Sequence, residues 1–146
     1  MAELQVAASL AELSSIGAFV LTAAEQAGLD RHAAYRLRLA VDELATNVIV
    51  HGKPAEHSGD DQIRLRSETD DEHLTIIMED RGPAFDPLEH KGVDEHLDKP
   101  IAERPIGGLG VFLALRGVDR FQYERVGDRN RSIFMARRSG QAQVTP

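Results

Sequence analysis

The chain of 146 residues has no cysteine and no tryptophan, and only 5% of its residues are aromatic. The lack of cysteine excludes disulfide bonds, thiolate metal sites and a cysteine nucleophile. No apolar run is long enough to cross a bilayer and no signal segment opens the chain, so we expect a cytoplasmic protein with no membrane partner. Acidic residues outnumber basic ones. With 17 Lys and Arg against 24 Asp and Glu, the net charge is −7 with His neutral, and direct nucleic-acid binding is not expected.

The length and the apolar content favour one globular domain. An apolar fraction of 42% is ordinary for such a protein, and 146 residues can bury a core large enough to fold unaided. We therefore expect residues 1–146 to form a single domain. An acidic domain that handles an anionic ligand needs local means to bind it, such as a metal ion or backbone N–H groups.

The apolar periodicity predicts helices and hairpins that are segregated along the chain. In order we expect a strand at 3–8, helices at 10–27 and 31–50, a hairpin of strands 62–67 and 73–79, an irregular lid at about 81–107, a helix at 108–116, and a hairpin of strands 121–126 and 131–137 joined by a turn at 127–130. A lid of this length without regular structure is disordered or functional. Segregated elements favour a two-layer α+β sandwich over a doubly wound α/β fold.

Capping residues mark the helix ends in this scheme. Ser9 is expected to cap the first helix, with Glu12 completing a capping box. Gly28 should end that helix, Asp30 should begin the next, and Gly117 should take the C-cap position of the third.

The second helix carries two polar side chains beside its apolar stripe. Glu43 and Asn47 are four residues apart, so they share one face, next to the stripe that contains Val41 and Leu44. A carboxylate and an amide so placed are costly unless a polar group lies against them. Mg²⁺ bound to a phosphorylated ligand would satisfy them, since it prefers oxygen ligands. Taken alone, the pair is more often a partly solvated helix face.

A third polar residue is expected to point inward at the end of a strand. Leu74, Ile76, Met78 and Asp80 share one parity, so the Asp80 carboxylate should lie at the edge of the core. An inward carboxylate needs a hydrogen-bond donor, and an adenine amino group could supply one. The alternative is that Asp80 only caps its own turn before the break at 82–83.

Glycines at 107, 108 and 110 lead into the third helix. Closely spaced glycines let the backbone approach phosphate oxygens, and a helix N-terminus offers free N–H groups. The run lacks the Lys-Ser/Thr of a P-loop and follows no strand of a βαβ unit, so neither common nucleotide fingerprint applies.

Together the three motifs resemble those of the GHKL ATP-binding superfamily. The segment 43–47 is similar to its N-box, 80–82 to its first glycine box and 108–110 to its second. The phrases at 42–47, 82–87 and 118–121 resemble the anti-sigma regulatory factors, serine kinases of the RsbW/SpoIIAB type. The similarity covers about residues 4–138. It implies the GHKL (Bergerat-type) fold, a mixed, mostly antiparallel sheet with helices on one face.

The resemblance also implies roles for the polar residues. Glu43 would be the general base that takes a proton from a protein serine, and Asn47 would bind the Mg²⁺ that bridges the ATP phosphates. Asp80 would accept a hydrogen bond from the adenine amino group. His51 would either orient the metal site or be a structural histidine near the helix end.

The glycine boxes would supply the rest of the nucleotide site. Gly82 would let the chain turn beneath the base, and Gly108 and Gly110 would line the phosphates. The remaining residues assigned to the nucleotide are Ala84, Arg104, Gly107 and Leu109. Among them, Arg104 would reach the γ-phosphate from the end of the lid, and Ala84 stands where the superfamily often has a second glycine.

The function implied by the resemblance is an ATP-dependent serine kinase that is also an anti-sigma factor. It would phosphorylate a STAS-domain anti-anti-sigma factor, sequester a sigma factor and form a homodimer, with ATP and Mg²⁺ as cofactors. One alternative is a non-catalytic ATP-binding switch. Another is a sister kinase that acts within a complex and activates a phosphatase.

Overall fold

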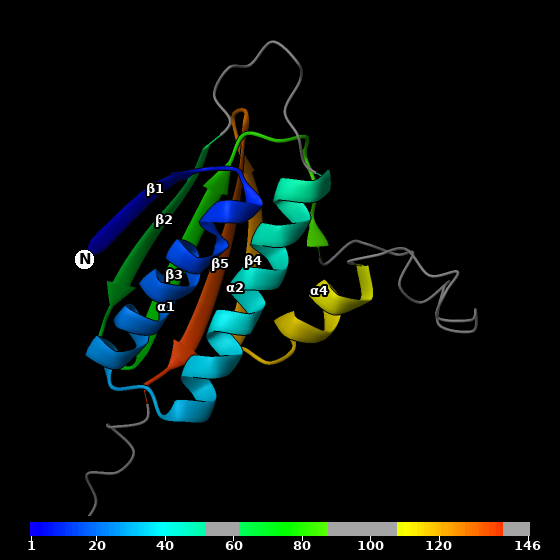
Figure 1. Cartoon of the computed structure of the whole chain (residues 1–146). Helices are drawn as coiled ribbons and strands as arrows, with labels where there is room; N and C mark the ends of the chain where they lie inside the picture. Colours follow the sequence, from blue (N-terminus) through cyan, green and yellow to red (C-terminus); the bar gives the residue numbers. More distant parts are fainter. Residues whose placement is uncertain (52–61, 88–107, 139–146) are drawn as a thin grey trace, which may run out of the picture.

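The computed structural model describes residues 1–51, 62–87 and 108–138 (Figure 1). The elements, in chain order, are β1 (Ala2–Ala7), the 3₁₀ helix η1 (Leu10–Glu12), α1 (Leu13–Ala27), α2 (Arg31–His51), β2 (Gln62–Thr69), β3 (His73–Asp80), α4 (Gly108–Leu115), β4 (Arg120–Val126) and β5 (Arg129–Arg137). The predicted order of helices and hairpins is confirmed, and most boundaries differ by one or two residues. None of the helices in these ranges is long and apolar enough to span a membrane.

The strands form one five-stranded sheet in the order β1-β2-β3-β5-β4. All four pairings between these described strands are antiparallel, so the expected parallel contribution to a mixed sheet is not found in this part of the chain. Helices α1 and α2 lie side by side over one face, and α4 lies beside α2 (Figure 1). The predicted two-layer α+β sandwich is confirmed.

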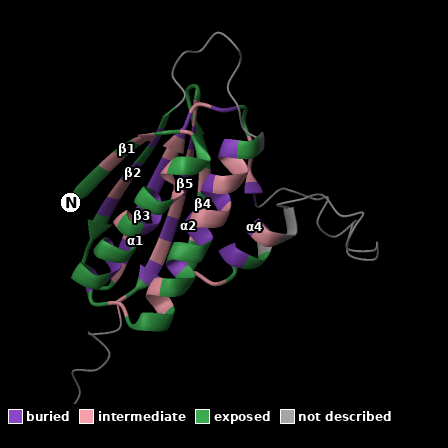
Figure 2. Ribbon diagram, viewed as in Figure 1, coloured by how far each residue is buried: buried purple, intermediate pink, exposed green. Residues whose placement is uncertain are grey.

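The core lies between the helices and this face of the sheet (Figure 2). Leu37, Val41 and Leu44 of the predicted stripe on α2 are all buried. The sheet contributes residues of one parity from each central strand, among them Phe134, which packs edge-on against Phe121 at 5.1 Å between ring centroids. The apolar periodicity in the sequence therefore identified the buried faces correctly.

The chain enters α1 differently from the prediction. Ser9 Oγ accepts a hydrogen bond from Ala11 N at 3.3 Å, but it caps the short 3₁₀ helix, and α1 begins only at Leu13. The capping box is not formed, because the Ser9 N–H donates to Ala7 O at 2.8 Å and is unavailable to the Glu12 carboxylate.

The connection from α1 to α2 follows the prediction. Gly28 has φ 78°, a left-handed conformation that favours glycine, and its N–H donates to Ala24 O and Glu25 O. Asp30 Oδ1 accepts from Ala33 N at 2.8 Å, the geometry of an N-cap. Two short-range capping interactions thus turn the chain back so that α2 lies against α1.

Gly117 has a different role from the one expected. It follows the end of α4, but its φ is not positive, so it is not a left-handed C-cap. A Cβ at this position would lie 3.2 Å from Ala114 O and 3.5 Å from two carbons of the Arg36 side chain. Arg36 Nε also donates to Gly117 O at 3.1 Å. The glycine therefore permits close packing of the end of α4 against α2.

The hairpin of β4 and β5 is tighter than predicted. The pairing extends to Val126 and Arg129, so the turn contains only Gly127 and Asp128. Gly127 has φ 62° and Asp128 does not have a positive φ, as in a type II′ turn. The consequence is that Asn130, expected in the turn, belongs to β5.

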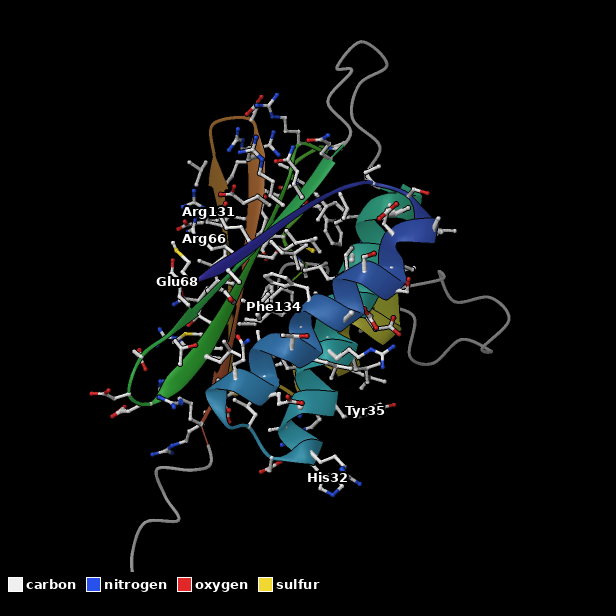
Figure 3. The ribbon with its side chains drawn as sticks, turned by 60° about the vertical axis from the view of Figure 1, so that its left-hand side comes forward. His32, Tyr35, Arg66, Glu68, Arg131 and Phe134 are labelled. Atoms are coloured by element: carbon white, nitrogen blue, oxygen red, sulfur yellow. The ribbon has the colours of Figure 1, made fainter. Side chains whose placement is uncertain are left out.

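The opposite face of the sheet carries a set of ion pairs. Glu79 pairs with Arg131 at 2.7 Å and Arg129 at 3.6 Å, and Arg131 also pairs with Glu124 at 2.9 Å. Arg66 pairs with Glu68 at 3.0 Å on the same face. Figure 3 shows Arg66, Glu68 and Arg131 on the side away from the helices. Because these side chains pair with one another, the unusual polar groups are those on the helix side.

Candidate functional site

Two of the predicted motifs approach each other where Glu43 on α2 lies beside Gly110 on α4. A Cβ on residue 110 would lie 3.0 Å from Glu43 Oε2 and 3.7 Å from its carboxyl carbon. Any larger residue at this position would push the carboxylate away. The structure therefore places the N-box carboxylate against the second glycine box, although 67 residues of sequence separate them.

Asn47 lies on the same side of α2 as Glu43, one turn further along. Both side chains are half-buried, in keeping with a position beside the apolar stripe rather than opposite it. In the described ranges, no group of three or more His, Asp or Glu side chains could hold a metal ion. A Mg²⁺ ion held here would take one amide oxygen from Asn47 and need its other ligands from water and phosphates, a common arrangement for this ion.

The neighbouring carboxylate, Asp42, has a different environment. It pairs with Arg38 at 3.3 Å. The Arg38 side chain packs against α1 at Gly17, where a Cβ would lie 3.0 Å from Arg38 Nε. Burial raises the pKa of Asp42, and Arg38 partly offsets this. Asp42 Oδ1 is buried and makes no hydrogen bond to the described residues. The two adjacent carboxylates therefore have different neighbours: Asp42 pairs with Arg38, and Glu43 approaches Gly110 of α4.

Asp80 points inward at the end of β3, as its parity predicted. It is 5% exposed, and Leu74, Ile76 and Met78 of the same parity are buried as well. Its Oδ1 accepts hydrogen bonds from Gly82 N at 2.8 Å and Asn130 Nδ2 at 3.0 Å. The turn-capping interpretation is thus correct for one oxygen.

The other carboxylate oxygen of Asp80, Oδ2, differs from Oδ1 in its hydrogen bonding. Within residues 1–51, 62–87 and 108–138, Oδ2 accepts no hydrogen bond. Burial raises the pKa of Asp80, and the hydrogen bonds from Asn130 and Gly82 and the charge of Arg125 lower it in part. A buried carboxylate with one unused oxygen suits a ligand that brings a donor, such as an amino group on an adenine ring.

Asn130 is a site residue that the sequence analysis missed. It lies directly opposite Asp80 in the pairing of β3 with β5 and is 5% exposed. A signal was available, because extending the parity of Ser132 and Phe134 back by one step places residue 130 on the inner face. Because a turn was predicted at residues 127–130, residue 130 was excluded from the strand and this parity was not applied to it.

Several predicted site residues are only partly described. Gly82 is buried and Ala84 exposed, on the segment that follows β3. Gly108 and Leu109 lie in the first turn of α4. The side chains of Leu109 and His51, together with Arg104, Gly107 and the greater part of the lid at 88–107, fall outside the described residues.

Residues 6–136 match the family described as the histidine kinase-like ATPase domain. The match covers most of the chain and includes all three motifs. The chain therefore belongs to this family, and its fold is that of a GHKL-type ATPase domain. Comparison with curated proteins gives no match.

Two bacterial proteins are among the solved structures that match this chain. One is the structure of the RsbU and RsbW domains of Rv1364c from Mycobacterium tuberculosis, with a TM-score of 0.59 and 14% identity over 94% of this chain and 32% of that chain. The other is the histidine kinase AdeS of Acinetobacter baumannii, with a TM-score of 0.49 and 16% identity over 95% of this chain and 68% of that one. The chain spans about a third of the Rv1364c structure, and the likeness shows a shared fold.

Proposed function

We propose that this protein is an ATP-dependent serine protein kinase that also acts as an anti-sigma factor. The observation that carries the proposal is the position of the Glu43 carboxylate against Gly110, with Asn47 one turn further along the same face of α2. Family membership supports the use of ATP. The resemblance of the motifs to those of the anti-sigma regulatory factors supports a serine as the acceptor.

Glu43 would act as the general base. It takes the proton from the serine hydroxyl as that oxygen forms a bond to the γ-phosphorus of ATP, and the bond from the γ-phosphorus to the bridging oxygen breaks to release ADP. A carboxylate oxygen can accept the hydroxyl proton and so suits this task. The proximity of Gly110 would hold the base beside the phosphate-binding backbone of α4.

Asn47 and Asp80 would hold the two ends of the nucleotide. Asn47 would ligate a Mg²⁺ ion, which neutralises phosphate charge when bound. Asp80 Oδ2 would accept a hydrogen bond from the adenine amino group. The first turn of α4, with Gly108 and Gly110, would present N–H groups to the phosphates.

The proposed partners are proteins. The phosphorylated substrate would be a STAS-domain anti-anti-sigma factor, the sequestered protein a sigma factor, and the kinase itself a homodimer in the cytoplasm. The competing functions are a nucleotide-binding switch without catalysis and a kinase within a complex that activates a phosphatase. An ionisable base beside the glycine box favours catalysis, because a pure binder does not need one.

Phosphoryl transfer to a purified STAS-domain protein from γ-labelled ATP tests the proposal. The wild-type protein should label a serine of that partner. Glu43→Gln should bind ATP as tightly and label the partner ~10²–10⁴-fold more slowly, a typical loss for a general base. Asp42→Asn is the matched control, because this neighbouring carboxylate pairs with Arg38 and should be dispensable for transfer.

The outcomes separate the candidates. ATP binding without transfer to any STAS-domain protein would support the switch. Equal transfer by Glu43→Gln and wild type would rule out Glu43 as the base. Retention of a sigma factor on the immobilised protein, with release when the unphosphorylated STAS protein is added, supports the anti-sigma role. Failure of every sigma factor to bind would overturn the anti-sigma role but would not contradict the proposed kinase activity.

A further inference from the structure

We infer that Asn130 is a positioning residue of the nucleotide site, which holds the Asp80 carboxylate and the turn after β3 in the orientation that selects adenine. This inference rests on the proposed role of Asp80. It assigns the selectivity to a second side chain, on β5, that contacts the carboxylate rather than the base.

The amide group of Asn130 is at the centre of a hydrogen-bond network. Its Nδ2 donates to Asp80 Oδ1 at 3.0 Å, Pro83 O at 2.9 Å and Gly82 O at 3.3 Å. On the other side, Oδ1 accepts from Phe85 N at 3.3 Å. One side chain therefore contacts the carboxylate and three backbone groups, at residues 82, 83 and 85, of the segment that follows it.

Two side chains of β4 complete the network. Arg125 Nη1 donates to Asn130 Oδ1 at 3.2 Å and to Gly82 O at 2.8 Å, and the Tyr123 hydroxyl donates to Asn130 Oδ1. The edge hairpin is thereby connected to the turn after β3 through Asn130. Residues from β3, β4 and β5 meet at this point only after the sheet has formed.

The neighbours determine which way the amide faces. A carboxylate and two backbone carbonyls can only accept hydrogen bonds, so Nδ2 must point toward Asp80, Gly82 and Pro83. The Phe85 N–H and the Arg125 guanidinium can only donate, so Oδ1 must point toward them. No other side chain of this size supplies two donors and an acceptor in this arrangement. Aspartate, which has nearly the same shape, lacks the donors.

This arrangement controls which oxygen of Asp80 a ligand can use. Asn130 and the Gly82 N–H both bind Oδ1, and in the described part of the chain Oδ2 accepts nothing. Rotation of the carboxylate would break both bonds in a buried setting, which is costly. The carboxylate is therefore held with one oxygen presented as an acceptor, which suits an amino group and opposes a carbonyl at the same position.

The test measures ATP and GTP binding by calorimetry, and thermal unfolding, for the wild-type protein, two variants of Asn130 and one control variant. Asn130→Ala should weaken ATP binding by roughly ten- to a hundredfold, the loss expected when the Asp80 carboxylate is no longer positioned to accept the hydrogen bond from adenine. It should also lower the ratio of the ATP affinity to the GTP affinity. Ser67→Ala is the control. It removes a buried hydroxyl group on β2 that accepts a hydrogen bond from Ala2 N on β1, so it perturbs the same sheet but should leave the selectivity unchanged.

A second variant distinguishes a loss of ATP affinity caused by misplacement of Asp80 from one caused by general destabilisation of the fold. Asn130→Asp keeps the shape and places a carboxyl against Asp80 Oδ1. Two carboxyls at this distance share one proton more readily than they both ionise. The introduced carboxyl, when protonated, regains one donor. ATP affinity of Asn130→Asp should therefore rise as the pH falls from about 8 to about 6, over which the wild-type affinity should change much less.

The outcomes distinguish this inference from the proposed function. A wild-type protein that binds ATP and GTP equally would overturn the role of Asp80. Adenine selectivity in the wild type that persists in Asn130→Ala would overturn the role of Asn130 alone. If Asn130→Ala does not fold, a pH-independent ATP affinity of Asn130→Asp that equals the wild-type value would overturn it.

Discussion

Glu43 Oε2 lies 3.0 Å from the point that a Cβ of residue 110 would occupy, so the carboxylate on α2 lies tightly against the position that Gly110 leaves open on α4. The contact joins two motifs that are far apart in the sequence. It also implies that the side chain at 110 controls the position of the carboxylate, since an added methyl group and Oε2 would compete for the same space.

Gly110→Ala should therefore displace the Glu43 carboxylate by a few tenths of an ångström or more. We expect phosphoryl transfer to fall by about tenfold or more, because misplaced catalytic groups lose rate steeply. The helix itself should become more stable, since alanine is favoured over glycine in a helix by roughly 1 kcal/mol. Transfer assays and thermal unfolding of the same variant measure the two effects.

Leu113→Ala is the control for Gly110→Ala. Leu113 lies on the same helix and is 56% exposed, so its replacement should leave transfer unchanged. Full activity of Gly110→Ala would show that Glu43 tolerates the added methyl group and that the close contact is not needed for function.

Asp80→Asn should separate stability from nucleotide binding. Affinity for ATP should fall by roughly ten- to a hundredfold, because a charged acceptor is lost. GTP should be rejected less strongly, since asparagine presents a donor as well as an acceptor. Calorimetry with both nucleotides measures these changes. Unaltered ATP affinity together with unaltered exclusion of GTP would mean that Asp80 only caps its turn.

The ligand-free form of Asp80→Asn should be more stable than the wild type at neutral pH. Burial raises the pKa of Asp80 in the folded state, so the folded protein binds this proton more tightly than the unfolded chain. The contribution of Asp80 to the free energy of unfolding therefore falls as the pH rises through the interval between the two pKa values. The stability advantage of the variant should grow over that interval and then stay constant, as urea unfolding at several pH values would show.

Asn47→Ala should make nucleotide binding less dependent on Mg²⁺, because it removes the proposed amide ligand. Titration of ATP with Mg²⁺ and with a chelator measures the dependence. Asn47→Asp is the control, since a carboxylate oxygen also suits Mg²⁺ and should preserve the dependence. The same ratio of affinities in Asn47→Ala as in the wild type would exclude Asn47 as a ligand.

Asp30→Ala should destabilise the protein by about 1 kcal/mol without any change in nucleotide affinity, because it removes the N-cap of α2. The Oδ1 atom of Asp30 accepts from Ala33 N at 2.8 Å, at the end of α2 opposite Asn47. Asp30→Asn should retain most of the stability, as asparagine caps helices about as well. Equal melting temperatures for Asp30→Ala and the wild type would show that the cap contributes nothing measurable.

Much of the fold could be predicted from local patterns, because the interactions that form helices and hairpins are short-range. The apolar stripe of α2 and the end of α1 at Gly28 follow from periodicity and from backbone conformation. Prediction from local patterns was wrong where a backbone group could form its hydrogen bond with more than one partner. The N–H of Ser9 donates to Ala7 O instead of the Glu12 carboxylate. The turn between β4 and β5 contains two residues, whereas the composition of residues 127–130 predicted a turn of four.

Local periodicity is enough to identify the polar residues of the candidate site and the face of each element on which they lie. Glu43 beside a helical stripe and Asp80 at an inward strand position follow from the periods of 3.6 and 2. Which of these residues come together depends instead on the packing of the whole domain. The contact of Glu43 with Gly110 and the amide network of Asn130 depend on strand order and helix packing, which join residues far apart in the chain. Because such contacts form only after the sheet and the helix layer are assembled, no local pattern contains them.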